Sequence, residues 1–384
     1  MASLPTPNSE QLAHSALLSN TIRDEIAGSG GWISFARYME LALYAPGLGY
    51  YSAGSKKIGG SGDFVTAPEI SPLFSRCLAH QAAQVIAETG GDVLELGAGT
   101  GRLAVQMLLE LQKLNSLPQH YRILEVSADL RAVQKETLAR ELPEDLSQRV
   151  EWLDALPATL TGFVFGNEVL DALPVDIVAW QQDGCHERGV ALEDGRFVWR
   201  ERPLPHESLL ETASALDLPP GYVSEICLAA TGLIASLATR LERGLVLFID
   251  YGFPRREYYH PQRFSGTLMC HYRHQAHDDP FFYPGLQDIT AHVDFTSMAE
   301  AGVTHGLQLQ GYTTQAQFLI NCGITDLLSE VSPTDMAAYL PLTTQAQKLL
   351  SPAEMGELFK VIALGKSLQT PLRGFAGGDK RHAL

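Results

Sequence analysis

Short apolar runs alternate with amphipathic stretches through much of the chain. The runs that have the length of buried strands cover residues 92–97, 121–126, 149–153, 162–167, 244–252 and 359–367. Between the first three of them, and before the first, apolar residues recur at the three- and four-residue spacing of helices. Buried strands that alternate with helices form parallel sheets covered on both faces, so we predict an α/β fold with a doubly wound, mostly parallel sheet.

The N-terminal part of the chain has a different pattern. We expect a first helix that has Ser9 as its N-cap, begins at Glu10 and ends at the glycine-rich residues 28–31. A second helix is expected at 34–44. Residues 45–70 keep neither period, and long loops inside compact proteins are usually functional or disordered. Because this segment is rich in aromatic residues, including Tyr50 and Tyr51, we interpret it as an ordered lid.

Two segments interrupt the alternation, and we place both at one end of the sheet. Residues 176–203 have the pattern of a β meander, a long helix is expected around 223–242, and 253–288 is irregular and rich in aromatics, prolines and histidines. The predicted organisation is N-terminal helices and a lid at 1–71, a core at 72–175 and 243–369, an inserted lobe at 176–242, an inserted loop of the core at 253–288, and a frayed tail at 370–384.

Composition and charge limit the partners and the compartment. The formal net charge of −16 disfavours nucleic acid and anionic membranes and favours cationic partners. No apolar run approaches the ~18 residues of a membrane span, and the N-terminal sequence does not resemble a signal or transit peptide. The five cysteines form no C-x-x-C pair, which suits free thiols in a reducing compartment. We therefore expect a cytoplasmic protein.

The strongest local signal is DVLELGAGTGRLA at 92–104, where an apolar strand ends in a glycine-rich turn that leads into a helix. Gly97, Gly99 and Gly101, with Ala98 between the first two, can adopt positive φ and let a ligand approach the backbone, while the amides at the helix start face that ligand. The turn therefore predicts a nucleotide-like cofactor.

Neighbouring residues narrow the kind of cofactor. Arg102 stands where the dinucleotide fingerprint G-x-G-x-x-G needs its third glycine, and Glu95 would repel a pyrophosphate but suits a cationic amino-acid group. Glu125, at the end of the second strand, can accept both hydroxyl protons of a ribose in either cofactor class. Asp154, after the third strand, either accepts from an adenine amine or only caps the following turn. These residues favour a cationic sulfur nucleoside over NAD.

A polar group follows the fourth strand, in GNEVLDALPVD. Asn167, Glu168 and Asp171 lie at the carboxyl edge of the predicted sheet, beside the glycine turn, where ligands bind open α/β sheets. Acids after a buried strand are costly unless they have a partner, so we expect these three residues to grip substrate or cofactor. The alternative is a helix cap by Asn167 with solvated acids behind it.

Histidines gather in CHYRHQAHDD at 270–279, so a metal site has to be considered. The surrounding prolines and glycine favour a loop, and we expect a polar wall of the substrate cleft instead of metal ligation. His292 and Asp294 are likewise expected to line the cleft and to cap a helix. We predict no bound metal.

These segments, in this order, resemble the MidA family of S-adenosylmethionine-dependent methyltransferases, relatives of a mitochondrial complex I assembly factor that methylates arginine. The likeness, from about residue 34 to 320, is carried by ALYAPGLGYYS, GDFVTAPEIS, LELGAGTGRLA, YRILEVSADLRAVQ, NEVLDALPVD, FIDYG, GLQDITAHVDF and GYTTQAQFL. The resemblance implies a class I methyltransferase core with S-adenosylmethionine as cofactor. It places Glu95, the glycine turn and Glu125 at the cofactor, and Asn167, Glu168 and Asp171 near the transferred methyl.

The resemblance also suggests a protein side chain such as arginine as the methyl acceptor. Glu168 and Asp171 would hold its guanidinium through charge-assisted hydrogen bonds and leave one nitrogen lone pair facing the methyl. The lid would close over the site and exclude water. Its contributing residues are Tyr50, Tyr51, Asp63 and Glu69.

Two other functions stay open at this point. One is an assembly factor that keeps the cofactor fold but acts by binding a partner protein, and the other is an NAD-dependent oxidoreductase. An α/β-hydrolase lacks its G-x-S-x-G here, and a P-loop protein lacks its G-x-x-x-x-G-K-[ST]. The insertions could also mediate a homodimer.

Overall fold

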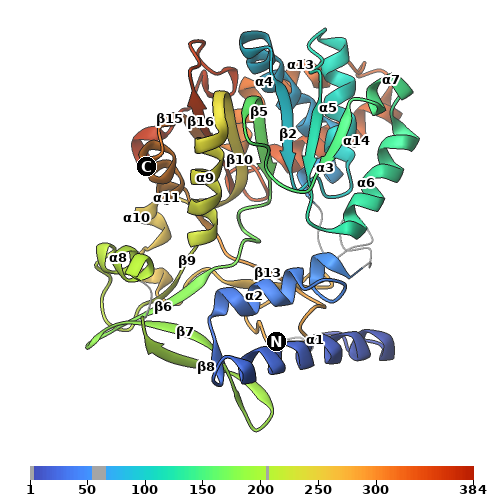
Figure 1. Cartoon of the computed structure of the whole chain (residues 1–384). Coiled ribbons are helices and arrows are strands. Elements are labelled where there is room, and N and C mark those ends of the chain that lie inside the picture. The colour runs from blue at the N-terminus through green and yellow to red at the C-terminus, as the bar shows by residue number, and fades with distance from the viewer. Residues whose placement is uncertain (1–3, 54–65, 205–206) are drawn as a thin grey trace.

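The computed structural model describes residues 4–53, 66–204 and 207–384, and an eight-stranded sheet forms its centre (Figure 1). The strands follow the order β15-β16-β10-β5-β2-β3-β4, and β14 pairs with β10. Their bounds are β2 (Asp92–Leu96), β3 (Tyr121–Leu124), β4 (Val150–Leu153), β5 (Leu160–Asn167), β10 (Leu241–Phe253), β14 (Val293–Asp294), β15 (Gln308–Thr314) and β16 (Phe359–Lys366). The strands from β4 to β10 are parallel, and β16 is antiparallel to both neighbours. The predicted doubly wound sheet is confirmed.

The chain order places a crevice at the middle of this sheet. The chain runs outward from β2 through β3 to β4 and then crosses back to β5, which lies on the other side of β2. Such a reversal of direction is a topological switch point, and ligands of open α/β sheets bind there, outside the carboxyl ends of the strands.

The central strands have apolar residues on both faces, which explains why helices cover both faces of the sheet. In β5, Phe163 and Phe165 join one core and Val164 joins the other, as the two-residue period of a strand requires. Helices α4, α5, α12 and α13 contribute to the first core, and α9 and α11 to the second. The helix bounds are α3 (Ala67–Ile70), α4 (Pro72–Thr89), α5 (Arg102–Lys113), α6 (Ala128–Glu141), α7 (Glu144–Ser147), α9 (Leu228–Arg240), α10 (Arg255–Tyr258), η2 (Pro261–Arg263), α11 (Phe295–Thr304), α12 (Gln315–Asn321), α13 (Ile324–Ser329) and α14 (Met336–Leu350).

A second layer lies below the core strands in Figure 1. It contains a five-stranded sheet of order β1-β7-β6-β9, with β8 paired to β7, which packs against the N-terminal helices. Its elements are α1 (Ser9–Gly28), β1 (Trp32–Ile33), α2 (Phe35–Tyr44), η1 (Tyr50–Ser52), β6 (Asp176–Gln181), β7 (Gly184–Glu193), β8 (Arg196–Pro203), α8 (Glu207–Ala215) and β9 (Val223–Ile226). The predicted meander is confirmed.

Three local predictions are wrong. The cap of α1 is Asn8, not Ser9, because Asn8 and Gln11 exchange hydrogen bonds in a capping box. The helix predicted around 223–242 begins as strand β9, which pairs with β6, before α9 starts. The irregular insertion contains a three-stranded sheet, β12-β11-β13, formed by β11 (Met269–Tyr272), β12 (Gln275–His277) and β13 (Asp288–Thr290).

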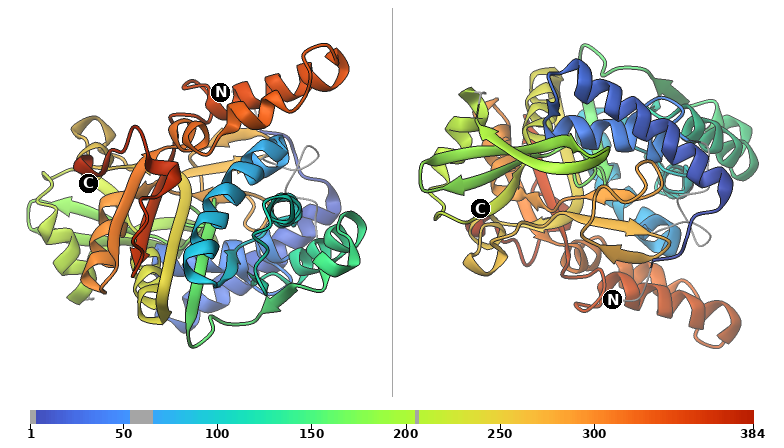
Figure 2. Two further views of the ribbon diagram at one scale, coloured as in Figure 1. Left: turned by 90° about the horizontal axis from the view of Figure 1, so that it is seen from above. Right: turned by 90° about the horizontal axis from the view of Figure 1, so that it is seen from below.

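The C-terminal segment is packed, so the prediction of a frayed tail is also wrong. The short helices η3 (Arg373–Phe375) and η4 (Arg381–Ala383) lie against the core. Phe375 is buried beside Phe318, with ring centroids 5.7 Å apart, and the Gly374 amide donates to Gln81 Oε1 at 2.9 Å. By contrast, Figure 2 shows the orange segment that ends in α14 projecting from the body.

Candidate active site

A cavity of about 570 Å³ opens at the carboxyl ends of β2, β3, β5 and β10. The core supplies one side of it, α2 and η1 supply a second, and the small β11–β13 sheet supplies a third. Most of the predicted site residues line it: Tyr51, Glu69, Glu95, Gly97, Ala98, Gly99, Glu125, Asn167, Glu168 and Asp171. The switch point of the sheet and the polar residues predicted from the sequence therefore coincide.

The glycine turn after β2 has the predicted backbone. Gly97, Gly99 and Gly101 all have positive φ, at 66°, 52° and 84°. A Cβ atom on Gly101 would lie 2.7 Å from Leu138 Cδ1, so a larger residue there would have to displace the Leu138 side chain. Glu69 of α3 accepts hydrogen bonds from the Thr100 hydroxyl and, at 3.1 Å, from Arg102 Nη1. The predicted lid residue Glu69 thus binds the turn directly.

Glu95 lies buried in the cavity wall, where its carboxyl group has a tyrosine as hydrogen-bond partner. The Tyr121 hydroxyl donates to its Oε2 at 2.7 Å. Burial raises the pKa of Glu95 to about 8, and the nearby Glu125 carboxylate acts in the same direction. A carboxyl group held in this way is poised to ionise when a cation enters the cavity.

Glu125, after β3, is held in place by its neighbours. It accepts from the Ser127 amide and from Gln134 Nε2, each at 3.0 Å. Burial raises its pKa. Gln134 Nε2 also donates to the Gly99 carbonyl at 3.0 Å, so α6 ties this acid to the glycine turn. Sequence analysis missed Gln134, which the helical pattern alone does not distinguish.

The turn after β5 brings the three predicted polar residues together. Glu168 adopts a left-handed φ of 54°, and its carboxylate accepts from Asn167 Nδ2 at 2.9 Å and from the Tyr251 hydroxyl at 3.4 Å. Burial raises the pKa of Glu168 to about 8, helped by Asp250. Burial and the neighbouring Asp250, Asp288 and Glu168 also raise the pKa of Asp171. The helix-cap alternative for Asn167 does not hold, because its side chain binds Glu168.

Sequence analysis missed two further buried acids. Asp250 lies at the end of β10 and accepts from four backbone amides, three of them in the turn after β5. Asp288 of β13 lines the cavity from the opposite side and accepts from the Tyr51 hydroxyl at 3.0 Å. Asp250 lies in the C-terminal part of β10 and Asp288 begins β13. Each acid stands next to apolar residues, and this pattern is the signal that could have found them.

The N-terminal segment closes over the cavity through two tyrosines. Tyr44 and Tyr51 stack with ring centroids 5.6 Å apart, and the Tyr44 hydroxyl donates to the Ala172 carbonyl at 2.9 Å. The Ser127 hydroxyl donates to the Tyr51 carbonyl at 2.7 Å. Tyr50 is buried behind Tyr51 and does not line the cavity. The predicted lid residue Asp63 lies outside the described residues.

Besides Tyr50, three predicted residues lie outside the cavity lining: Gly101, Asp154 and His292. The Asp154 side chain is 93% exposed and pairs with Arg131 at 2.7 Å. His292 stacks on Phe253 instead, with ring centroids 5.3 Å apart, and burial lowers its pKa to about 4. Asp294 caps α11 as predicted.

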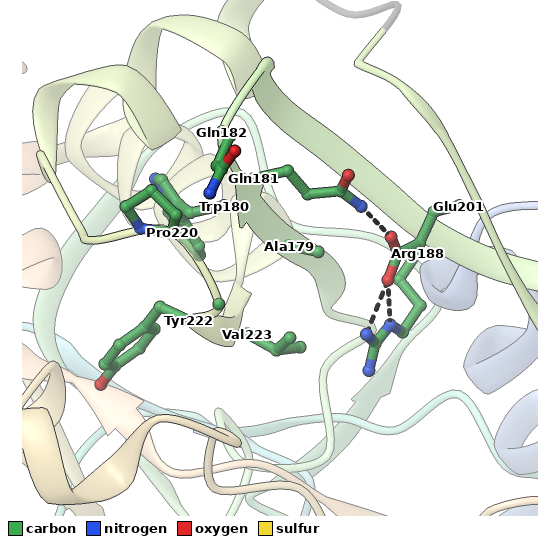
Figure 3. A pocket seen from close by; sticks show the side chains of 10 residues that line it. Ala179, Trp180, Gln181, Gln182, Arg188, Glu201, Pro220, Tyr222 and Val223 are labelled. Carbon is green, nitrogen blue, oxygen red and sulfur yellow. Dashed lines mark hydrogen bonds and ion pairs between the residues drawn. The ribbon is translucent and has the colours of Figure 1, made fainter.

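The histidine segment forms a hairpin of β11 and β12, not a loop, and His271 lines the cavity, as expected for a polar wall. Among the described residues, no cluster of potential metal ligands is present. Figure 3 shows a second cavity, of about 440 Å³, on the lobe sheet, where Arg188 donates to Glu201. It contains none of the predicted site residues.

Comparison with known proteins places the chain among methyltransferases. Residues 77–313 match the family model described as "Putative S-adenosyl-L-methionine-dependent methyltransferase". The chain superposes on a Burkholderia thailandensis crystal structure bound to S-adenosyl-homocysteine with a TM-score of 0.96 and 52% identity, over 100% of each chain. A native structure from the same organism gives a TM-score of 0.93 over the same coverage.

Curated relatives are more distant. The mitochondrial protein arginine methyltransferase NDUFAF7 of Danio rerio is 29% identical over 367 residues, which are 87% of this chain and 83% of the relative. The human protein of the same name is 28% identical over 370 residues, 88% of this chain and 80% of the relative. In the described part of this chain, no helix is both long and apolar enough to cross a membrane.

Proposed function

Since this chain belongs to the matched family of S-adenosylmethionine-dependent methyltransferases, we propose that it transfers the methyl group to an arginine side chain of a protein. The MidA-type family, the class I fold and the cofactor predicted from the sequence are confirmed. The comparisons do not support an NAD-dependent oxidoreductase. The arginine acceptor, the cytoplasmic location and a homodimer stay predictions.

The observation that carries this proposal is the excess of acid in the cavity. Its carboxylates are Glu40, Glu69, Glu95, Glu125, Glu168, Asp171 and Asp288. Of the described residues that line it, Arg102 alone carries a permanent positive charge, and it is paired with Glu69. Buried carboxylates need compensating charge. A cationic cofactor beside a guanidinium supplies that charge, whereas a neutral or acidic acceptor does not.

The residues that we assign to the cofactor lie around the glycine turn. Glu95 would face its amino group, and Glu125, oriented by Ser127 and Gln134, would accept from the ribose hydroxyls. The positive φ values of the turn let the backbone approach the ligand. When bound, S-adenosylmethionine supplies an activated methyl group on a sulfonium.

We assign acceptor binding to the turn after β5. Glu168 and Asp171 would hold the guanidinium by charge-assisted hydrogen bonds, and Tyr44 and Tyr51 would cover it. The guanidinium nitrogen that faces the methyl would take it up, S-adenosylhomocysteine would be the leaving group, and the nitrogen's proton would pass to the adjacent Glu168 carboxylate. Holding the two reactants in line can contribute about 7 to 11 kcal/mol to barrier lowering.

The test uses radiolabelled methyl donor with peptide pools that contain arginine, lysine or neither. We expect label on arginine, and we expect Glu168→Gln to lower turnover by about 100-fold while S-adenosylhomocysteine affinity changes less than about threefold. Glu201→Gln on the lobe is the matched control and should leave both unchanged. Label on lysine alone would refute the arginine assignment. Intact cofactor binding without label on any pool or lysate protein would favour the assembly-factor alternative.

A further inference from the structure

The turn that carries Glu168 and Asp171 is built around one buried carboxylate that does not line the cavity. Asp250 is fully buried at the end of β10, next to β5 in the sheet. Its Oδ2 accepts from the amides of Val169 at 3.1 Å, Leu170 at 2.8 Å and Asp171 at 3.3 Å. Its Oδ1 accepts from the Tyr251 amide at 2.9 Å. Consecutive amides that converge on one oxygen form an anion-binding nest.

This arrangement determines where the two acceptor-binding acids point. Glu168 donates its amide to the Ile249 carbonyl at 2.9 Å and takes a left-handed φ, and the next three amides then turn toward Asp250. A left-handed conformation is unfavourable for a residue other than glycine, and it persists only where the surroundings hold it. The bonds to Asp250 supply that restraint.

The same turn also contacts the cofactor side of the cavity. A Cβ atom on Gly97 would lie 3.1 Å from Val169 Cγ2, so the Val169 methyl fills the space beside the first glycine. Leu170 is buried in the second core. The turn is therefore held at its apolar residues by packing and at its amides by Asp250.

We propose that Asp250 is a positioning residue, whose carboxylate binds the amides of residues 169–171 and thereby aims Glu168 and Asp171 at the methyl acceptor. It touches neither substrate nor cofactor and acts through the turn. This inference rests on the proposed function for the identity of the acceptor, but the position of the turn can be measured without any acceptor.

The test is Asp250→Asn, which keeps the size of the side chain. Both oxygens of Asp250 accept from backbone amides, so the NH₂ group of asparagine faces N–H donors in either orientation. Hydrogen exchange of a peptide covering 168–172 should become at least about 10-fold faster, and that of 93–105 should stay unchanged. With a labelled acceptor in hand, turnover should fall about 100-fold while S-adenosylhomocysteine affinity stays within about threefold. Asp294→Asn, which alters a buried acid that caps α11, is the control and should leave the 168–172 peptide unchanged.

Unchanged exchange at 168–172 in Asp250→Asn would overturn the proposal, whatever the activity. If that variant does not fold, the wild-type protein decides: the amides of 169–171 should exchange at least about 100-fold more slowly than the same residues in an unfolded peptide, and rates close to the unfolded ones would overturn the proposal. A variant with fast exchange and unchanged arginine turnover would refute the aiming role. If arginine proves not to be the acceptor, the hydrogen-exchange result for 168–172 is unaffected. Failure of the proposed function can therefore be distinguished from failure of this inference.

Discussion

Glu95 and Glu168 stay protonated in the folded protein at pH values where an exposed glutamate is ionised. Burial raises the pKa of each to about 8 from an ordinary value of 4.5. The folded chain therefore binds more protons than the unfolded chain between these two pH values. Stability rises with pH only where the unfolded state binds more protons, and here the folded state binds more. The stability that the two protonated glutamates contribute is therefore fully present below pH 4.5 and is lost as the pH rises to 8.

Stability of the free protein and affinity for the cofactor should change in opposite directions with pH. We expect the melting temperature of the free protein to fall between pH 6 and pH 8.5, and the affinity for S-adenosylmethionine to rise over the same range, because Glu95 must ionise to face a cation. Calorimetric titration at several pH values measures the second effect. S-adenosylhomocysteine carries the same amino group and should show a similar rise, and Glu95→Gln should flatten the rise for both ligands. An affinity that does not change with pH in the wild-type protein would contradict the assignment.

Gly101 in the glycine turn after β2 combines a left-handed backbone with a crowded Cβ position. Gly101→Ala combines a φ of 84° with a Cβ atom 2.7 Å from Leu138 Cδ1. We expect a loss of about 1 to 3 kcal/mol of unfolding free energy and at least about 10-fold weaker cofactor binding, measured by denaturant unfolding and calorimetry. Gly90→Ala, at a φ of 65° with open space around it, separates backbone strain from crowding. It should lose stability but keep the affinity.

At the scale of elements, sequence analysis succeeds where local pattern and burial agree. The core strands have continuous apolar runs because both faces of the sheet are covered, and these runs predicted β2, β5, β10 and β16. β9 and η3 were missed because their positions depend on partners far away in the sequence, and the β11–β13 sheet was missed because its strands are too short to show a period. β9, for example, pairs with β6 and takes its place from that strand.

The candidate site could likewise be predicted only where a single stretch of sequence contains the signal. Glycine spacing and strand ends predicted three parts of the cavity lining: the glycine turn after β2, Glu125 and the turn after β5. Asp250, Asp288 and Tyr44 were missed as site residues because three separate segments bring them to one cavity, and no single window of sequence contains that information. Asp154 was expected near the cofactor from its place after a strand, but it lies outside the cavity lining, where Arg131 of α6 pairs with it at the surface.

The inserted segment is held to the lobe by one buried acid. Glu225 of β9 is 3% exposed and accepts from the Thr267 and Leu268 amides and from the Tyr258 hydroxyl. Glu225→Ala leaves these donors without a partner, so we expect a loss of about 2 to 4 kcal/mol in denaturant unfolding and faster proteolysis between 258 and 268. Glu193→Ala removes an exposed ion pair with Arg200 and should cost less than about 1 kcal/mol. Equal losses would contradict this account.

Over the whole molecule, the C-terminal segment is part of the core. Phe375 packs on Phe318, and Asn321 Nδ2 donates to the Gly374 carbonyl at 2.9 Å. We expect Phe375→Ala to lower the free energy of unfolding by about 3 to 5 kcal/mol, measured with urea, because a buried aromatic ring leaves a cavity. His382→Ala, at an exposed position of the same segment, should change it by less than about 0.5 kcal/mol. A frayed segment would give two small effects.

The overall charge should govern how an acceptor arrives. The chain carries a net charge of −16, and the exposed Glu40 lies where the cavity meets the surface. Charges at the surface are screened over about 10 Å at 0.1 M salt, whereas the buried acids are screened much less. For a peptide with arginine between basic residues, we therefore expect KM to rise about 10-fold from 50 to 500 mM salt, with kcat within about twofold. The same peptide with neutral flanks should show a KM that is nearly independent of salt, so any salt effect on the basic peptide comes from steering. A kcat that falls with salt while KM stays constant would instead place the screened charges at the reacting groups.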